Sequence, residues 1–412
     1  MISDILEQIK IQIKRVKTAN GFYSQKLKDI NIEDIKEFSD FEQLPFSEKD
    51  NLREAYPLGL SVVPEERIVR IHSSSGTTGT PVIIPYTQKD VDDWALLFKR
   101  CYEIAGVSPL DRIHITPGYG LWTAGIGFQL GAEKLGAMTI PMGPGNTNKQ
   151  LNFMIDLKST VLCATSSYAL LLAEEISRRG LHNKIHLKKG IIGSERWGEK
   201  MRERIAAELG VELYDIYGLT EIYGPGIAIN CTHHTGMHYF NDFLYIEVID
   251  PKTGKVLPEG QTGELVITTL KKDAAPLIRY RTHDLSRIIP SNSPCPCGRS
   301  YPRIDVILGR TDDMIKVKGV NIFPAQFDSV LKKIKDVSSE YQIMIDHLEG
   351  KDTVTLFFET PVAEHSMLKR IEADVKIQCK SDIGISVNPK GVAIGELPRS
   401  EKKTTRIFDN RY

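Results

Sequence analysis

The sequence predicts an α/β protein with a large N-terminal domain, which combines mixed sheets, helices and a small β-barrel, and a small α+β C-terminal domain. Helical and strand-like segments alternate from about residue 90 to 210, residues 240–310 are rich in strand formers, and strand, helix, strand returns after Asp313. The chain has 412 residues, more than one ordinary core supports. We therefore expect domains at 1–310 and 311–412.

The first part of the chain predicts strands that lie beside helices. Val69-Arg70-Ile71-His72 is a short strand that leads into a Ser/Gly/Thr loop, and Val82-Ile83-Ile84 is the strand after it. Val91–Phe98 has the period of a helix. Val161–Thr165 and Ile191–Gly193 are short apolar runs typical of buried strands. This alternation predicts a mostly parallel sheet covered by helices.

The region at about 225–310 has a different character. Phe243–Ile249 and Gly263–Thr268 are β-rich, and Pro and Gly turns separate them. Such segments predict an antiparallel sheet or a small barrel. The tail of about 100 residues that follows predicts a separate small domain.

Composition excludes several classes of protein. The 53 basic and 53 acidic residues balance, so there is no broad attraction to nucleic acid or to anionic lipid. We expect no membrane span, because no apolar run approaches the roughly 20 residues required. Met1–Gln8 reads as an amphipathic helix rather than a signal peptide, which makes the cytoplasm the expected location. The six cysteines are then expected to be thiols or metal ligands.

The loop Ser73-Ser74-Ser75-Gly76-Thr77-Thr78-Gly79-Thr80-Pro81 is a candidate phosphate site. Its glycines permit close backbone approach, and its hydroxyl and N–H groups can surround a phosphate. A flexible linker is the alternative, but a strand on each side favours a tight loop. It lacks the Gly-Lys-Ser/Thr of the common nucleotide-triphosphate loop. The candidate cofactor-binding residues here are Ser74, Ser75, Gly76, Thr77 and Thr78.

Four further segments follow this loop in the chain: Tyr217-Gly218-Leu219-Thr220-Glu221, Arg279-Tyr280-Arg281-Thr282-His283-Asp284-Leu285, Gly309-Arg310-Thr311-Asp312-Asp313 and Leu397-Pro398-Arg399-Ser400-Glu401-Lys402-Lys403. Taken alone, the first is a strand end with a turn, and an Asp between arginines is a surface ion pair. Together the five segments resemble, in order and over nearly the whole chain, the motifs of the adenylate-forming enzymes. Neighbouring stretches resemble the phenylacetate–CoA ligase branch; they are Tyr56–Leu60, Arg70–Ser75, Gly118–Leu121 and Val317–Pro324.

This resemblance implies roles for the matched residues. Tyr217 packs on adenine, Thr220 holds the α-phosphate, and Glu221 binds Mg²⁺, for which a carboxylate is a suitable ligand. Asp284 and Arg310 contact the ribose. Asp312 is the hinge about which the C-terminal domain moves as a lid. Further cofactor-binding candidates implied by the resemblance are Gly193, Ser194, Glu195, Asp215 and Gly218.

Two positions depart from the family pattern. Lys403 falls on the catalytic lysine of the resembling enzymes, but Lys402 stands where Gly is usual, so the assignment between these two lysines stays open. Thr80 occupies a loop position that is commonly Lys, which removes a direct charge contact to the β- and γ-phosphates.

A metal site is a further candidate. Cys231, His238 and the Cys295-Pro296-Cys297 pair can complete a tetrahedral zinc site. Four unrelated residues are the alternative, and His233 and His234 compete with His238 as ligands. Members of the resembling branch often carry such a cluster. With four protein ligands the zinc would be structural and would clamp two loops together.

The resemblance implies an ATP-dependent acid–CoA ligase that forms an acyl-adenylate and uses ATP, Mg²⁺ and CoA. Tyr119, Trp122 and Phe128 are expected to line a pocket for an aryl or small apolar acid. One alternative is an adenylating ligase with another acceptor, such as a deazaflavin cofactor or a carrier protein. Another is a catalytically silent nucleotide-binding relative. A homodimer is implied by the resemblance alone, and no nucleic-acid partner is expected.

Overall fold

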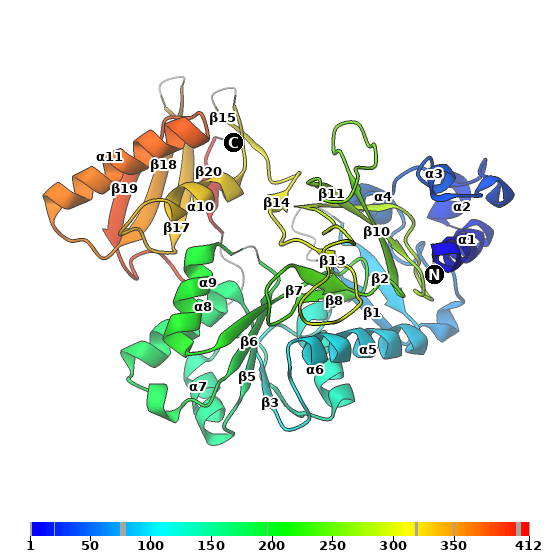
Figure 1. Cartoon of the computed structure of the whole chain (residues 1–412), viewed down its shortest axis with the longest axis horizontal. Helices are drawn as coiled ribbons and strands as arrows, with labels where there is room; N and C mark the ends of the chain where they lie inside the picture. The colour runs from blue at the N-terminus through cyan, green and yellow to red at the C-terminus, as the bar shows by residue number, and fades with distance from the viewer. Residues whose placement is uncertain are drawn as a thin grey trace. The chain divides into compact units, whose positions relative to one another are not determined.

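The computed structural model describes residues 2–19, 21–74, 80–195, 197–317, 320–348, 351–400 and 405–411. They form two compact units. The first comprises Met1–Gly143, Thr160–Cys163 and Tyr214–Ile307, and the second comprises Pro144–Ser159, Ala164–Leu213 and Leu308–Tyr412. Figure 1 labels most of the helices and strands of both units. Within the described ranges, none of the helices combines the length and the apolar character needed to cross a bilayer.

The first unit has three long helices, α1, α5 and α6, and several short ones. The predicted Val91–Phe98 helix is part of α5 and is therefore confirmed. Thr87 caps this helix, since its hydroxyl accepts a hydrogen bond from the Asp90 N–H. Its helices are α1 (Ile2–Thr18), α2 (Phe22–Lys26), η1 (Ile32–Asp34), α3 (Phe38–Phe41), α4 (Lys49–Glu54), η2 (Glu65–Arg67), α5 (Gln88–Ile104) and α6 (Thr123–Leu135).

Strands of the first unit pair in both directions. β3 runs parallel to β4 and to β5, whereas β7, β8, β9 and β13 pair antiparallel in that order. The prediction of a mostly parallel sheet, made for residues of about 90–210, is confirmed by β3, β4 and β5, and the antiparallel group follows it in the chain. Only a few residues join β7 to β8, and so short a connection permits antiparallel pairing alone. The strands are β3 (Arg112–Ile115), β4 (Met138–Pro141), β5 (Val161–Thr165), β7 (Glu212–Leu219), β8 (Gly224–Asn230), β9 (Met237–Tyr239) and β13 (Arg303–Ile304).

Two further antiparallel groups complete this unit. The hairpin of β1 (Arg70–Ser73) and β2 (Ile83–Tyr86) encloses the predicted phosphate loop. β10 (Leu244–Ile249), β11 (Gly263–Thr269) and β12 (Tyr280–Ser286) pair in that order. The prediction of an antiparallel sheet in the β-rich region is confirmed.

Helices α5 and α6 pack closely against each other through small residues. A Cβ atom on Gly131 of α6 would lie 2.3 Å from the Phe98 Cβ of α5, so only glycine fits there. Trp94 and Phe98 are fully buried, and the Trp94 indole N–H donates to the Pro225 carbonyl of β8 at 2.9 Å. This packing fixes the start of α6, which carries residues of the predicted acid pocket.

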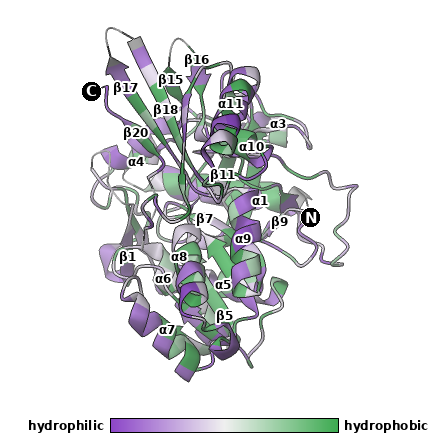
Figure 2. Ribbon diagram, turned by 90° about the vertical axis from the view of Figure 1, so that its left-hand side faces the viewer, coloured by the Kyte–Doolittle hydropathy of each residue, from purple (hydrophilic) through white to green (hydrophobic). Residues whose placement is uncertain are grey.

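The second unit begins with helices and one strand. They are α7 (Thr147–Asp156), α8 (Ser166–Arg178), η3 (His182–Lys184), β6 (Lys189–Gly193) and α9 (Glu199–Leu209). Thr165 caps α8 by accepting from the Tyr168 N–H. Helices in Figure 2 carry both purple and green segments, the mixed composition expected of helices with one buried face.

The segment 308–412 of the second unit forms a sheet covered by two helices. Its strand order is β19-β18-β17-β20, with β17 and β18 antiparallel and both outer pairs parallel. Phe327 and Val330 of α10 and Val375 of α11 are buried in its own hydrophobic core. Its elements are β14 (Gly309–Arg310), β15 (Ile315–Val317), β16 (Val320–Ile322), α10 (Pro324–Lys332), β17 (Tyr341–Leu348), β18 (Lys351–Thr360), α11 (His365–Asp382), β19 (Asn388–Ala393) and β20 (Ile407–Asp409).

The fold class is therefore the predicted one, mixed α/β with an α+β C-terminal segment. The two compact units are not divided at residue 310, because 144–159 and 164–213 cluster with the C-terminal segment. The division into domains at 1–310 and 311–412 stays a prediction.

Candidate active site and metal cluster

The base of the predicted phosphate loop is closed by Ser74. Its hydroxyl accepts from the Val82 N–H at 3.0 Å, and its own N–H donates to the Val82 carbonyl at 3.0 Å. Ser74 is thus buried and holds the two ends of the loop together. Ser75, Gly76, Thr77 and Thr78 lie outside the described residues, so their predicted contacts with phosphate stay predictions.

The predicted acid pocket lies next to this loop base. The Leu121 carbonyl accepts from the Ser73 N–H at 3.0 Å and lies 3.1 Å from His72 Nδ1. Burial lowers the pKa of His72 to about 4, so this ring is neutral at physiological pH. The strand that enters the loop and the segment that carries the pocket residues are therefore joined directly.

The three predicted pocket residues differ in their surroundings. Trp122 is half-exposed, whereas Phe128 is buried with its ring centroid 5.0 Å from that of Phe98. The Tyr119 hydroxyl is buried and makes no hydrogen bond within the described part of the chain. Burial raises the pKa of Tyr119, so its hydroxyl remains a donor. Their role in binding an acid stays a prediction.

Tyr217 and Asp284 meet, although they are 67 residues apart in sequence. The Tyr217 hydroxyl donates to Asp284 Oδ2 at 2.7 Å, and both residues are buried. Gly218 follows at a register shift between β7 and β8. A Cβ there would lie 2.0 Å from the Gly224 carbonyl oxygen, so only glycine fits. The bulge at Gly218 turns the chain after the Tyr217 ring and brings the next polar residues to the end of β7.

Thr220 and Glu221 occupy the turn after β7. The Thr220 hydroxyl lies 3.4 Å from that of Thr123, at the start of α6. Glu221 is buried, and its Oε1 lies 3.2 Å from Lys49 Nζ on α4. Sequence reasoning did not find Lys49, because nothing in its spacing connects it to a residue 172 positions later. The one sign in the sequence was a lysine at the start of a short helix, where a positive charge opposes the helix dipole.

The remaining candidates of the first unit and those of the second are positioned by local bonds. The Asp215 N–H donates to Asn230 Oδ1 at 2.9 Å. In the second unit, Gly193 ends β6 and Ser194 has a positive φ of 69°. Glu195 Oε2 accepts from the hydroxyls of two residues at the start of α8, Ser166 at 2.9 Å and Ser167 at 2.5 Å.

The predicted hinge carries a paired arginine. Arg310 Nε and Nη2 donate to the two carboxylate oxygens of Asp312, each at 2.8 Å. Such a bidentate pair fixes the orientation of both side chains. Lys402 and Lys403 lie outside the described residues, so the choice between them and the catalytic role stay predictions.

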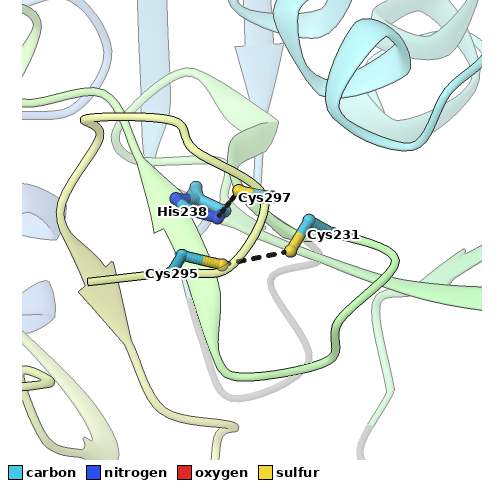
Figure 3. Close-up of side chains that lie close together, drawn as sticks. All are labelled: Cys231, His238, Cys295 and Cys297. Atoms are coloured by element: carbon cyan, nitrogen blue, oxygen red, sulfur yellow. Dashed lines mark hydrogen bonds between the residues drawn. The ribbon is translucent and has the colours of Figure 1, made fainter. Parts of the chain in front are cut away.

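The four predicted metal ligands converge in the first unit. Figure 3 shows Cys231, His238, Cys295 and Cys297 facing one another. One ligand atom from each lies within 4.8 Å of all the others. Cys231 Sγ is 3.5 Å from Cys295 Sγ, and Cys297 Sγ is 3.3 Å from His238 Nε2. The competing candidates His233 and His234 are exposed and are not part of this cluster.

The surroundings of the cluster suit a metal. His238 Nδ1 lies 3.0 Å from the Tyr301 carbonyl, which fixes the tautomer that leaves Nε2 directed at the sulfurs. Burial raises the pKa of Cys231 to about 11. Burial also acts to raise the pKa of Cys295, but hydrogen bonds from Thr235 and Cys297 lower it to about 6. One thiolate is therefore available at neutral pH, and a cation would favour the others.

Comparisons with known proteins agree with this geometry. Residues 8–270 match the family model described as AMP-binding enzyme, and residues 319–411 match the AMP-binding enzyme C-terminal domain. A phenylacetate-coenzyme A ligase of Pseudomonas putida is 39% identical over 98% of this chain and 93% of its own length. One of Escherichia coli is 40% identical over 93% and 88%, and one of Thermus thermophilus is 37% identical over 98% and 95%.

Solved structures of a 2-hydroxyisobutyryl-CoA ligase are also similar. The ligase in its postadenylation state, in complex with 2-HIB-AMP, has a TM-score of 0.90 at 27% identity and covers 100% of this chain and 90% of that one. In the thioesterification state the TM-score is 0.72. On the family model and the relatives at 37–40% identity, this chain belongs to the AMP-binding enzyme family and, within it, to the phenylacetate-coenzyme A ligases.

Proposed function

We propose that this chain is an ATP-dependent acid–CoA ligase that activates a small carboxylic acid as an acyl-adenylate and transfers the acyl group to CoA. The observation that carries the proposal is the group formed by Tyr217, Asp284 and the turn residues Thr220 and Glu221 in one unit. These groups suit adenine, ribose, phosphate and Mg²⁺ respectively. The relatives named phenylacetate-coenzyme A ligase support the same reaction.

The first step joins the acid to AMP. A carboxylate oxygen attacks the α-phosphorus of ATP, the bond to the bridging oxygen breaks, and pyrophosphate leaves with the electron pair. The Tyr217–Asp284 pair orients the nucleoside, and the Thr220 hydroxyl donates to an α-phosphate oxygen. Glu221 would hold Mg²⁺, and the ion would supply positive charge for the departing phosphates. Positioning and charge neutralisation account for most of the barrier reduction in such transfers.

The second step forms the thioester. The CoA thiolate attacks the acyl carbon of the adenylate, the acyl–oxygen bond breaks, and AMP leaves. For this step the C-terminal segment rotates about Asp312 and moves Lys403 away, and such motions often set kcat. This segment contacts helices α8 and α9 through polar groups, such as Lys332 with Glu199 and Arg399 with Glu174, and such contacts can be broken and remade.

The acid is an aryl or short apolar carboxylic acid. Tyr119, Trp122 and Phe128 give an aromatic, mainly apolar lining beside the loop base. The buried Tyr119 hydroxyl supplies a polar group for orienting the bound acid. Phenylacetate and close analogues are the first candidates.

The cysteine and histidine cluster binds a structural zinc. The donors are three sulfurs and one imidazole nitrogen, all within 4.8 Å of one another, a set that zinc prefers in closed sites. Metal analysis of the purified protein is expected to give one zinc per chain, and Cys295→Ser to abolish it. Full metal retention in that variant would contradict the assignment. The homodimer and the cytoplasmic location stay predictions, and light scattering checks the first.

The ligase is tested by pyrophosphate release with ATP, Mg²⁺ and a panel of small acids, with and without CoA. We expect release to require an acid, and CoA to convert the adenylate into a thioester with release of AMP. Lys403→Ala is expected to slow adenylation about 10²- to 10³-fold. Lys369→Ala is the matched control, because Lys369 is an exposed lysine of the same segment paired with Glu372.

Two results would redirect the proposal. If an acid drives pyrophosphate release but CoA does not release AMP, the acceptor is another molecule, such as a deazaflavin or a carrier protein. If ATP binds but no acid gives turnover, the chain is a silent nucleotide-binding relative.

A further inference from the structure

The loop that is proposed to surround the ATP phosphates contains no cation. Residues 73–81 are Ser, Gly, Thr and Pro only, and Thr80, the last residue before Pro81, is exposed. The triphosphate of ATP carries several negative charges, and charge-assisted hydrogen bonds from Lys or Arg are the usual means of holding them. A cation from another element is therefore needed.

Lys49 is a cation that the fold brings to Glu221, the predicted Mg²⁺ ligand. Its Nζ lies 3.2 Å from Oε1 of Glu221. The Glu221 side chain is 6% exposed, whereas the Lys49 side chain is 38% exposed. The ammonium thus covers a buried carboxylate and remains open to solvent on its other side. A second lysine of the unit, Lys272, is enclosed by the rings of Tyr86 and Tyr223 and has no such access.

The segment that leads into Lys49 is anchored by buried bonds. Ser47 pairs with β12 through two backbone hydrogen bonds, from its N–H to the Arg279 carbonyl at 3.0 Å and from the Arg281 N–H to its carbonyl at 2.9 Å. The Ser47 hydroxyl accepts from the Tyr23 hydroxyl at 3.0 Å. Arg281 also donates to Glu48 at 3.0 Å. Since β12 carries Asp284, one strand fixes both the ribose carboxylate and Lys49.

Stability alone does not account for this arrangement. A partly exposed ion pair contributes little to stability, and a lysine in the first turn of a helix opposes the helix dipole. The arrangement does suit a ligand that adds negative charge between the two side chains. If Glu221 holds Mg²⁺, that ion would attract phosphate oxygens of ATP to this carboxylate. The Lys49 ammonium, 3.2 Å from Glu221 Oε1, would supply a second positive charge beside it.

We propose that Lys49 is a nucleotide-binding residue that donates to the β- and γ-phosphate oxygens of ATP and to departing pyrophosphate, supplying the charge that the loop lacks. Before ATP arrives, it neutralises Glu221. This proposal rests on the proposed function, because it takes Glu221 as the Mg²⁺ ligand. It makes Lys49 specific for the adenylation half of the reaction, since AMP and the acyl-adenylate have no β- or γ-phosphate.

The first test is equilibrium binding of fluorescent ATP and AMP analogues, with and without Mg²⁺, to the full chain and to Lys49→Ala. Loss of one charge-assisted contact is expected to weaken ATP about 10- to 100-fold and to leave AMP unchanged. Lys89→Ala is the matched control, since Lys89 is an ion-paired lysine of the same unit that contacts Asp93 at 2.5 Å. It is expected to change neither affinity.

The second test separates the two half-reactions. Lys49→Ala should slow acid-dependent pyrophosphate release and leave thioester formation from synthetic acyl-adenylate and CoA unchanged. Adding Thr80→Lys to the variant returns a cation to the loop and should restore part of the ATP affinity. A role confined to folding would lower both half-reactions and would not respond to Thr80→Lys.

Two outcomes would overturn the proposal. One is equal loss of ATP and AMP affinity in Lys49→Ala. The other is unchanged ATP affinity with a lower Mg²⁺ requirement, which would restrict Lys49 to neutralising Glu221. Failure of the proposed function is distinguishable, because it would appear in the unaltered protein as absence of acid-dependent pyrophosphate release, whereas the ratio of ATP to AMP affinity reports on Lys49 alone.

Discussion

Charged groups are used differently in two regions of the molecule. The first unit contains a fully buried ion pair. Arg279, with a side chain 1% exposed, donates to both oxygens of the 0% exposed Glu247 and to the Leu44 carbonyl. In the second unit, exposed pairs join the C-terminal segment to helices α8 and α9. Lys332 of α10 contacts Glu199 of α9 at 3.0 Å, and both side chains are more than half exposed.

The contacts of Arg399 lie between these extremes. Its guanidinium donates to Glu359 of β18, in its own segment, and to Glu174 of α8. Lys200 of α9 adds two bonds to backbone carbonyls of the segment, at Ile334 and Val337. The buried Arg279–Glu247 pair holds its residues in fixed positions inside the first unit. The segment 308–412 instead contacts helices α8 and α9 through polar bonds that water can replace.

The largest effect is expected when the buried pair of the first unit is broken. Arg279→Met leaves the Glu247 carboxylate buried without its partner, which is expected to lower the free energy of unfolding by about 3–5 kcal/mol. Arg287→Met is the matched control. Arg287 pairs with Asp305 on the surface and is 48% exposed, so its loss is expected to stay below about 1 kcal/mol. Urea unfolding of each variant at pH 8 measures both.

This cost should depend on pH. Burial already raises the pKa of Glu247 to about 7, although Arg279 acts to lower it. Without Arg279 the pKa of Glu247 rises further, so the folded variant binds more protons than its unfolded chain above pH 4.5, and its stability falls as pH rises. The unaltered protein shows the same fall up to its own Glu247 pKa of about 7, so the deficit of the variant should stay level at acid pH and grow as pH rises through 7 to pH 8. A constant deficit would show that lost packing, not charge, sets the cost.

The same contrast explains what the sequence could predict. Local patterns located the strands that flank the phosphate loop, helix α5, the β-rich region and the four members of the cysteine and histidine cluster, because each depends on residues near in sequence or on a distinctive ligand set. The antiparallel pairing of β7 with β8 was not foreseen, since apolar runs do not reveal pairing direction.

Long-range charge placement was beyond sequence reasoning. Asp284 read as a surface residue between arginines, but it is buried and accepts from Tyr217. Arg279 was identified only as part of a motif, and nothing in the sequence near it pointed to its partner Glu247 on β10. Lys49 and Glu221 are connected only because Ser47 pairs with β12, and that pairing leaves no local pattern in the sequence.

A smaller effect is expected from the buried lysine of the first unit. Lys272 Nζ lies 3.4 Å from the ring centroid of Tyr86 and 4.2 Å from that of Tyr223, and burial lowers the pKa of Lys272 to about 8. Between pH 8 and pH 10.5 the unfolded chain therefore binds more protons, and stability contributed by this group rises with pH.

Lys272→Met removes that contribution and keeps an apolar side chain of similar length. The stability of the variant relative to the unaltered protein should fall by roughly 3 kcal/mol from pH 7 to pH 11. Unfolding in urea across this range gives the difference, in which the titration of the tyrosines cancels. If the stability difference between the variant and the unaltered protein stays constant with pH, Lys272 does not carry a buried charge without a hydrogen-bond partner among the described residues.

The smallest effect probes the docked segment. Glu174→Gln weakens one of the two carboxylates that hold Arg399, at a site where the Glu174 side chain is 23% exposed. A loss of about 0.5–1 kcal/mol of docking free energy lowers the equilibrium constant for docking about two- to fivefold. On the proposed mechanism, adenylation slows by this factor and thioester formation from supplied acyl-adenylate does not.

Glu175→Gln is the control for this change, because it alters the next residue of the same helix. Glu175 pairs with Arg178 of α8 and with Arg179, which follows it, and among the described residues its side chain contacts no charged group of the segment 308–412. If both variants slow the two half-reactions equally, α8 acts through helix stability alone. If only Glu174→Gln changes the ratio of the two half-reaction rates, the contact of Arg399 with Glu174 sets the equilibrium between the docked and the released segment. Arg399 can re-form this contact because its bond to Glu359 keeps the guanidinium in place.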